Sequence, residues 1–150
     1  MAQDNLAHQK SLLKAENKKV LDSITSHFTT NPSSTSAVLH IKDISANTKA
    51  LSEAIKTISD PKKGTHKDKN IYLLASDGEG ENGKVVHGCY LSEEARGKGA
   101  DAAKWSLEVA GQVGGKAGGK GATSLGQGNK VENVQKAVEV AEKYLAELKL

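Results

Sequence analysis

The chain has 150 residues, of which 37% are hydrophobic and 26% are charged. This size and composition suit one globular domain with an aliphatic core, and they exclude a disordered chain. The formal net charge is +3, and the single cysteine, Cys89, excludes an internal disulfide framework. Because no apolar run approaches the length of a membrane span and the N-terminus is too polar for a signal peptide, we expect a soluble, cytoplasmic protein.

The N-terminal part predicts a helix over residues 3–28. Leu6, Leu13 and Val20 lie seven residues apart, as in a coiled-coil seam, but so short a repeat favours packing on the helix's own domain over self-association. The cluster TTNPSSTS cannot continue a helix. The sequence therefore predicts an N-terminal helical segment over 1–30 and a globular domain over 37–150.

The first half of that domain predicts the order β-α-β-β. Mixed alternation over 37–44 indicates a strand near a sheet edge, and TKALSEAIKTIS has the apolar spacing of a helix. Two compact apolar runs, 70–77 and 84–92, are joined by GEGENG. A glycine-rich connection between two such runs is typical of a hairpin.

The second half predicts two helices separated by a glycine-rich loop. Residues 101–113 have helical spacing, and Asn129 with Glu132 three residues later predicts the start of a final helix. Between them the segment 111–128 holds eight glycines in eighteen residues, which predicts a loop. The fold class is therefore α/β, with some α+β character: a small mixed sheet packed with helices after an N-terminal helix.

The segment 111–128 nearly matches a nucleotide-binding P-loop. Gly114, Gly119 and Lys120 satisfy G-x-x-x-x-G-K, but Gly121 stands where a serine or threonine would bind Mg²⁺. The segment also follows a helix, whereas a P-loop follows a strand. An ATP-binding P-loop is therefore disfavoured.

Two other near matches also fail. Arg96 and Gly99 fit an acetyl-CoA pyrophosphate turn, but Asp101 would place a carboxylate against the phosphates. His87 and Cys89 form only half of a metal site, so strand residues of alternating burial are the favoured interpretation. No arrangement of residues typical of catalysis stands out, and we predict no catalytic or metal-binding residue.

The physical character of the glycine-rich segment indicates anion binding. Glycines leave backbone N–H groups uncovered, and Lys116 and Lys120 add point charges that suit phosphate oxygens. From residue 84 to residue 130 the chain carries seven basic residues against four acidic ones. These features favour binding of a phosphate-bearing partner by shape and charge, with a flexible surface linker as the plain alternative.

The run VGGKAGGKGATSLGQG, after an alanine-rich helix and before a final helix, resembles the C-terminal domain of alanyl-tRNA synthetases, in the DHH-associated superfamily. The matching positions are Gly114, Gly115, Lys116, Gly118, Gly119, Gln127 and Gly128. The chain departs from the family pattern at Ala117, where the signature has glycine, and at Lys120-Gly121, where relatives often have Arg-Pro.

The resemblance implies a non-catalytic module that grips the outer corner, or elbow, of L-shaped tRNA. Such a module supports aminoacylation and editing by other domains of the synthetase, and in some family members it contributes to dimerisation. It implies no cofactor in this chain, because ATP, Mg²⁺ and Zn²⁺ would belong to those other domains, and no membrane partner.

The residues expected to contact RNA are Lys116, Lys120, Gly114, Gly115, Gly118, Gly119, Gly121, Arg96, Lys98 and Lys130. The alternative is a protein-interaction or dimerisation module with a generic basic surface for nucleic acid. An enzyme ranks third, because the Asp-His-His triplet of the related phosphoesterases is absent from the sequence.

Overall fold

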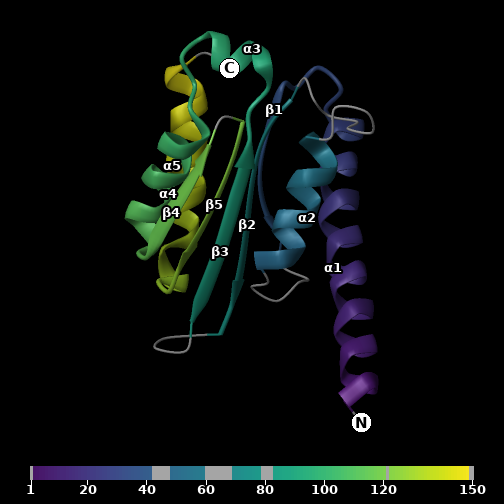
Figure 1. Cartoon of the computed structure of the whole chain (residues 1–150). Coiled ribbons are helices and arrows are strands. Elements are labelled where there is room, and N and C mark those ends of the chain that lie inside the picture. Colours follow the sequence, from purple (N-terminus) through teal and green to yellow (C-terminus); the bar gives the residue numbers. More distant parts are fainter. Residues whose placement is uncertain (1, 42–47, 60–68, 79–82, 121, 149–150) are drawn as a thin grey trace.

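The computed structural model describes residues 2–41, 48–59, 69–78, 83–120 and 122–148, with side chains in α1 described mainly from residue 17 onward. Figure 1 shows a sheet between two layers of helices. The elements in chain order are α1 (Ala2–Thr30), β1 (Ser36–Ile41), α2 (Thr48–Ser59), β2 (Asn70–Asp77), β3 (Lys84–Tyr90), α3 (Glu93–Gly97), α4 (Ala102–Val113), β4 (Lys116–Lys120), β5 (Thr123–Gly128), the 3-10 turn η2 (Val131–Asn133) and α5 (Val134–Glu147).

The sheet has five strands in the order β1-β2-β3-β5-β4. β1 pairs in parallel with β2 after the crossover through α2, and the other pairs are antiparallel. The predicted mixed sheet, the α/β class and the hairpin of β2 with β3 are therefore confirmed. β4 forms one edge of the sheet.

Helices cover both faces of the sheet. α1 and α2 share one apolar core with alternate residues of β2, such as Ile71 and Leu73, while α4 and α5 share the other core with Tyr72 and Leu74. The central strands are consequently buried on both faces, as their continuous apolar runs allow. His87 and Cys89 are strand residues, as the sequence indicates, but the expected alternation of burial is wrong, because every residue of β3 from Val85 to Tyr90 is buried.

The last turns of α1 pack on the domain. Val20, Ile24 and Phe28 are buried together with Leu51 and other residues of α2, and burying one aliphatic side chain contributes about 1.5–3 kcal/mol. These three residues of α1 are therefore not available for self-association, whereas the side chains of Leu6 and Leu13 lie outside the described residues. The boundary between a segment over 1–30 and a domain over 37–150 stays a prediction.

Trp105 connects α4 to α5 through a hydrogen bond and a ring contact. Its indole N–H donates to the carbonyl of Ala141 at 3.1 Å, and its ring lies 5.8 Å from that of Tyr144 in a stacked arrangement. Asp101 caps the start of α4 by accepting from the N–H of Ala103 at 2.9 Å. The acidic residue that is incompatible with an acetyl-CoA turn thus serves as a helix cap.

The segment 111–128 is not a loop. Its first three residues are the last turn of α4, and the rest contains β4 and β5, which pair as an antiparallel hairpin. The strands escape prediction because glycine has no side chain to show the alternation that marks a strand, and glycine is normally depleted in strands.

The final helix starts later than predicted. The N–H groups of Asn129 and Lys130 donate to the carbonyl of Val113 at 3.1 and 2.9 Å, which holds the chain against the end of α4. A 3-10 turn follows, and α5 begins at Val134 with no side-chain cap. Among the described residues, no helix is both long enough and apolar enough to cross a membrane.

Candidate nucleic-acid interface

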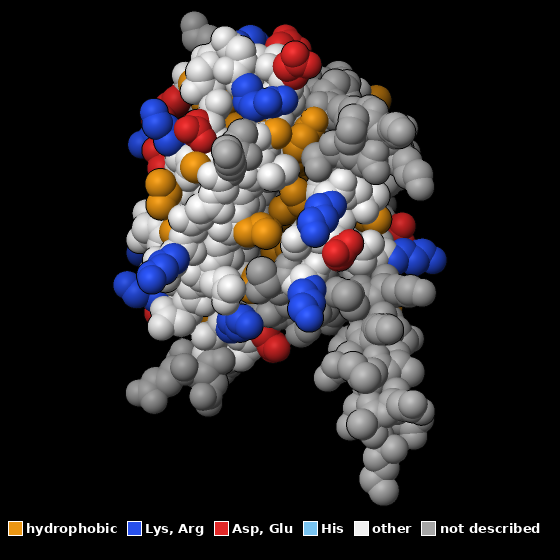
Figure 2. Space-filling model, viewed as in Figure 1, with side chains coloured by type: hydrophobic (Ala, Val, Ile, Leu, Met, Phe, Trp, Pro, Cys, Tyr) orange, Lys and Arg blue, Asp and Glu red, His pale blue; other side chains and the backbone are white. Residues whose placement is uncertain are grey.

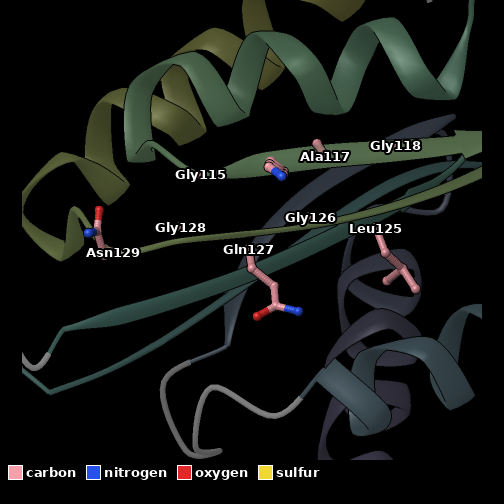
Figure 3. A pocket seen from close by; sticks show the side chains of 9 residues that line it. Gly115, Ala117, Gly118, Leu125, Gly126, Gln127, Gly128 and Asn129 are labelled. Atoms are coloured by element: carbon pink, nitrogen blue, oxygen red, sulfur yellow. The ribbon is translucent and has the colours of Figure 1, made fainter.

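The β4–β5 hairpin presents one face toward α2 and the other toward α4. Leu125 packs against the α1–α2 core, whereas the hydroxyl of its neighbour Ser124 shares a hydrogen bond with Ser106 of α4. Lys116 pairs with Gln127 and Gly118 pairs with Leu125, and cross-strand partners lie on the same face. Figure 3 shows Leu125 and Gln127 pointing to one side of the hairpin and Ala117 to the other.

A groove lies along this hairpin. It has a volume of about 560 Å³ and is lined by residues 115–118 and 125–129. We call it the hairpin groove (Figure 3). A second cavity of about 260 Å³, the α2 groove, lies between the hairpin and α2; it is lined by Ser52, Ile55 and Lys56 of α2 and by residues 118–119 and 123–125. Gly118 and Leu125 line both, so the two grooves adjoin.

Most hairpin glycines allow close contacts within the protein itself. Gly115 has a φ of +76°, and a Cβ there would collide with the carbonyl of Gln127. A Cβ at Gly126 would collide with the ring of His87, and one at Gly128 would lie 2.5 Å from the carbonyl oxygen of Val113. Packing alone therefore requires these glycines.

Gly118 differs from the other glycines of β4 and β5. No atom of the described structure lies within 4 Å of the place where its Cβ would be. A Cβ there would project toward the two grooves that Gly118 lines. Gly118 is therefore the strand glycine at which an external molecule can approach the main chain.

His87 sits beneath the hairpin in a buried polar pair. The Tyr72 hydroxyl lies 2.6 Å from His87 Nδ1. His87 Nε2 has no hydrogen-bond partner among the described residues. Burial lowers the pKa of His87 to about 4, so the ring is neutral at pH 7. Burial likewise raises the pKa of the Cys89 thiol, whose sulfur lies 3.5 Å from the carbonyl of Ala102.

The predicted contact residues divide between two ends of the hairpin. Lys116 and Lys130 are both exposed at the start of β4, and a Cβ at Gly114 would lie 3.7 Å from the side chain of Lys130. Lys120, at the other end of β4, pairs with Thr123, and four residues of strand span about 13 Å. Gly119 packs against Thr123 and Ser124, and Gly121 lies outside the described residues.

Arg96 and Lys98 lie at the second end. Both are exposed, on and just after α3, which follows the end of β3. There the N–H of Leu91 donates to the carbonyl of Ala122, in the turn of the hairpin, at 2.8 Å. Arg96 and Lys98 thus neighbour the hairpin turn and not the lysines at the start of β4.

Ser52 and Lys56 of α2 line the α2 groove, although the sequence does not predict that they lie near the hairpin. Their spacing of four residues puts them on one side of the helix, but no sequence signal links that side to a hairpin some sixty residues further along the chain.

Known proteins resemble the chain in sequence and in fold. The DHHA1 domain family matches residues 34–147. The alanine–tRNA ligase of Candida albicans is 40% identical over 144 residues, which cover 96% of this chain and 14% of the ligase. The mitochondrial alanine–tRNA ligase of Saccharomyces cerevisiae is 43% identical over 105 residues, or 70% of this chain and 10% of that ligase.

The chain thus spans only a small part of these ligases. In fold it resembles the crystal structure of the C-Ala domain from Aquifex aeolicus alanyl-tRNA synthetase, with a TM-score of 0.52, 17% identity, and coverage of 72% of this chain and 87% of that one. The family match extends over more than half of the residues. The chain belongs to the DHHA1 domain family and is homologous to alanine–tRNA ligases.

Proposed function

We propose that the chain is the tRNA-binding domain of an alanine–tRNA ligase and that its hairpin grips the outer corner of L-shaped tRNA. The observation that carries the proposal is the open main chain at Gly118, in a groove that Lys116 lines. The homology to alanine–tRNA ligases supports tRNA as the ligand.

The chemistry of the groove suits recognition by shape and charge. Lysine provides a point charge that meets phosphate oxygens without requiring one geometry. The described lining of the hairpin groove contains no aromatic ring, so stacking of unpaired bases has no platform there. Binding of a folded RNA surface through phosphates and riboses fits better.

In this proposal the chain contributes binding and no catalysis. Aminoacylation and editing, with their ATP, Mg²⁺ and Zn²⁺, belong to other domains of the ligase. By binding the tRNA corner, this domain helps to bring those other domains onto the same tRNA. A cytoplasmic location stays a prediction, since one of the relatives is a mitochondrial ligase.

The test is fluorescence anisotropy of the chain with three labelled ligands: a folded tRNA, an unfolded RNA of equal length and a short duplex. We expect tight binding to the folded tRNA. Affinity should fall about three- to tenfold in Lys116→Ala and in Lys120→Ala, because each variant removes one lysine from the phosphates.

The matched control is Lys136→Ala, an exposed lysine on α5 across the sheet from the hairpin groove, which we expect to bind as the wild type does. Equal affinity for all three ligands, or wild-type affinity in both hairpin variants, would contradict the proposal.

A further inference from the structure

We propose that α2 forms a second wall of the RNA site, so that one RNA strand lies in the furrow between α2 and the β4–β5 hairpin. The strand passes over Gly118, with phosphates flanked by Lys116 on the hairpin side and by Lys56 on the α2 side. This inference rests on the proposed tRNA-binding function and adds residues to its site.

The furrow is continuous across the two grooves. Gly118 and Leu125 line both of them, and Ser52, Ile55 and Lys56 close the far side. Figure 2 shows apolar side chains along the furrow and basic side chains on both of its sides. A binding surface confined to the hairpin would have only one of these walls.

The absence of a side chain at Gly88 of β3 allows α2 to lie close to the hairpin. A Cβ at Gly88 would lie 2.5 Å from Cδ1 of Ile55 and 2.7 Å from Cδ2 of Leu125. Those two side chains therefore meet above the glycine and form the apolar floor of the furrow. Because α2 sits this near, Ser52 and Lys56 are within reach of a molecule that contacts Gly118.

The charges of the furrow suit a phosphate backbone. The side chain of Lys56 is 72% exposed, and its Nζ lies 4.0 Å from Glu53, whose side chain is 56% exposed. An ion pair this exposed is weak, so a phosphate can compete with Glu53 for the lysine. Ser52 adds a hydroxyl that can donate to a phosphate or pair with a ribose 2′-hydroxyl.

An RNA strand fits this furrow better than an acidic peptide does. Lysines on two sides of an apolar floor match a strand that carries charge at regular intervals beside the uncharged faces of its riboses. The open main chain at Gly118 also admits the bulk of a sugar.

The first test compares variants of α2 and Gly118 in tRNA anisotropy. We expect Lys56→Gln to weaken affinity about two- to fivefold and Glu53→Gln, one turn away, to strengthen it by a similar factor, because one removes an attractive and the other a repulsive charge. Gly118→Ala should weaken binding, and Gly118→Val should weaken it more. Gly118→Ala should leave the unfolding midpoint unchanged, since its Cβ would meet no described atom within 4 Å.

Two outcomes separate the inference from the function on which it rests. Wild-type affinity in Lys56→Gln and Gly118→Val, together with weak binding by Lys116→Ala, would overturn the second wall and leave the hairpin as the whole site. A wild-type chain that binds no tRNA would overturn both proposals. Displacement of tRNA by polyglutamate at equal charge concentration would show a generic basic furrow and overturn the preference for RNA.

The second test measures proximity directly. Cys89 is the only cysteine and is fully buried, so Ser52→Cys can be labelled selectively with a photoactivated thiol-directed cross-linker. We expect cross-linking to tRNA from position 52 and little from Glu139→Cys, an exposed position on α5 behind the sheet. Equal yields from the two positions, or none from position 52 under binding conditions, would overturn the inference.

Discussion

His87 is a neutral histidine that the fold cannot easily protonate. It is fully buried, and its only described polar partner is the Tyr72 hydroxyl, on Nδ1. Protonation would place a charge among apolar side chains beneath the hairpin, which explains why burial lowers the pKa of His87 to about 4.

We expect His87 to make the stability of the protein depend on pH between about 6.5 and 4. In this window the unfolded chain binds a proton at His87 that the folded chain does not, so the free energy of unfolding falls as the pH falls. The decrease contributed by His87 reaches about 3 kcal/mol near pH 4.

Urea unfolding at several pH values, in wild type and in His87→Gln, checks this. The glutamine has no titrating ring but can still pair with the Tyr72 hydroxyl, so the difference in pH dependence isolates the histidine. Identical slopes for the two proteins between pH 6.5 and 4 would show that His87 does not govern the stability.

At the level of single residues, the sequence could predict charges but not close contacts. Lys116 and Lys130 are exposed as expected, because a lysine is rarely buried without a partner. The roles of the glycines stay hidden in the sequence, because most of the clashes lie with residues distant along the chain. Gly126 lies above His87, for example, and Gly115 lies against Gln127.

At the scale of elements, side-chain periodicity determines which ones can be predicted. The helices α2 and α4 and the strands β2 and β3 have strong apolar patterns and lie where the sequence predicts them. The short helix α3 is not predicted, since its five residues are too few to show a helical period. The hairpin has the sequence character of a loop because five of the thirteen residues from Lys116 to Gly128 are glycine.

The packing of α2 on the sheet depends on Gly88. We expect Gly88→Ala to destabilise the protein by about 1–3 kcal/mol, because the added methyl would force Ile55 and Leu125 to move. Chemical denaturation measures the change. Gly97→Ala is the control, since no described atom lies within 4 Å of the place where that methyl would be, and its effect should stay within about 0.5 kcal/mol.

Gly88→Ala should also weaken tRNA binding, because the added methyl would separate Ile55 from Leu125 and open the floor of the furrow. If Gly88→Ala were as stable as Gly97→Ala, α2 could shift without cost. The close packing of Ile55 and Leu125 above Gly88 would then not contribute to stability.

At the scale of the whole molecule, the two faces of the sheet are covered differently. The α4–α5 face is closed over a core that includes Trp105 and Tyr144. On the other face α2 reaches only as far as Leu125, and the hairpin extends past it. The sequence could predict a sheet packed with helices. It could not predict that helices lie on both faces or that one layer leaves part of the sheet uncovered, because both depend on how the elements are placed in space.

If Lys116 and Lys56 contact phosphates of the bound RNA, the affinity should depend on salt concentration. Removing one lysine that meets a phosphate should lower the slope of log affinity against log salt concentration by about 0.9 for duplex-like RNA. The double variant Lys116→Gln with Lys56→Gln should therefore have a slope shallower by about two units. Anisotropy titrations between about 50 and 200 mM salt measure it. A slope equal to that of wild type would mean that neither lysine meets a phosphate.

The position of β4 at the edge of the sheet has a consequence for synthesis of the chain. β4 precedes β5 in the sequence, yet β5 is its neighbour and separates it from β3. A growing polypeptide therefore emerges with β4 complete before the strand that anchors it exists. The hairpin groove can form only after residue 129 has left the ribosome, so the proposed RNA surface is among the last parts of the domain to assemble.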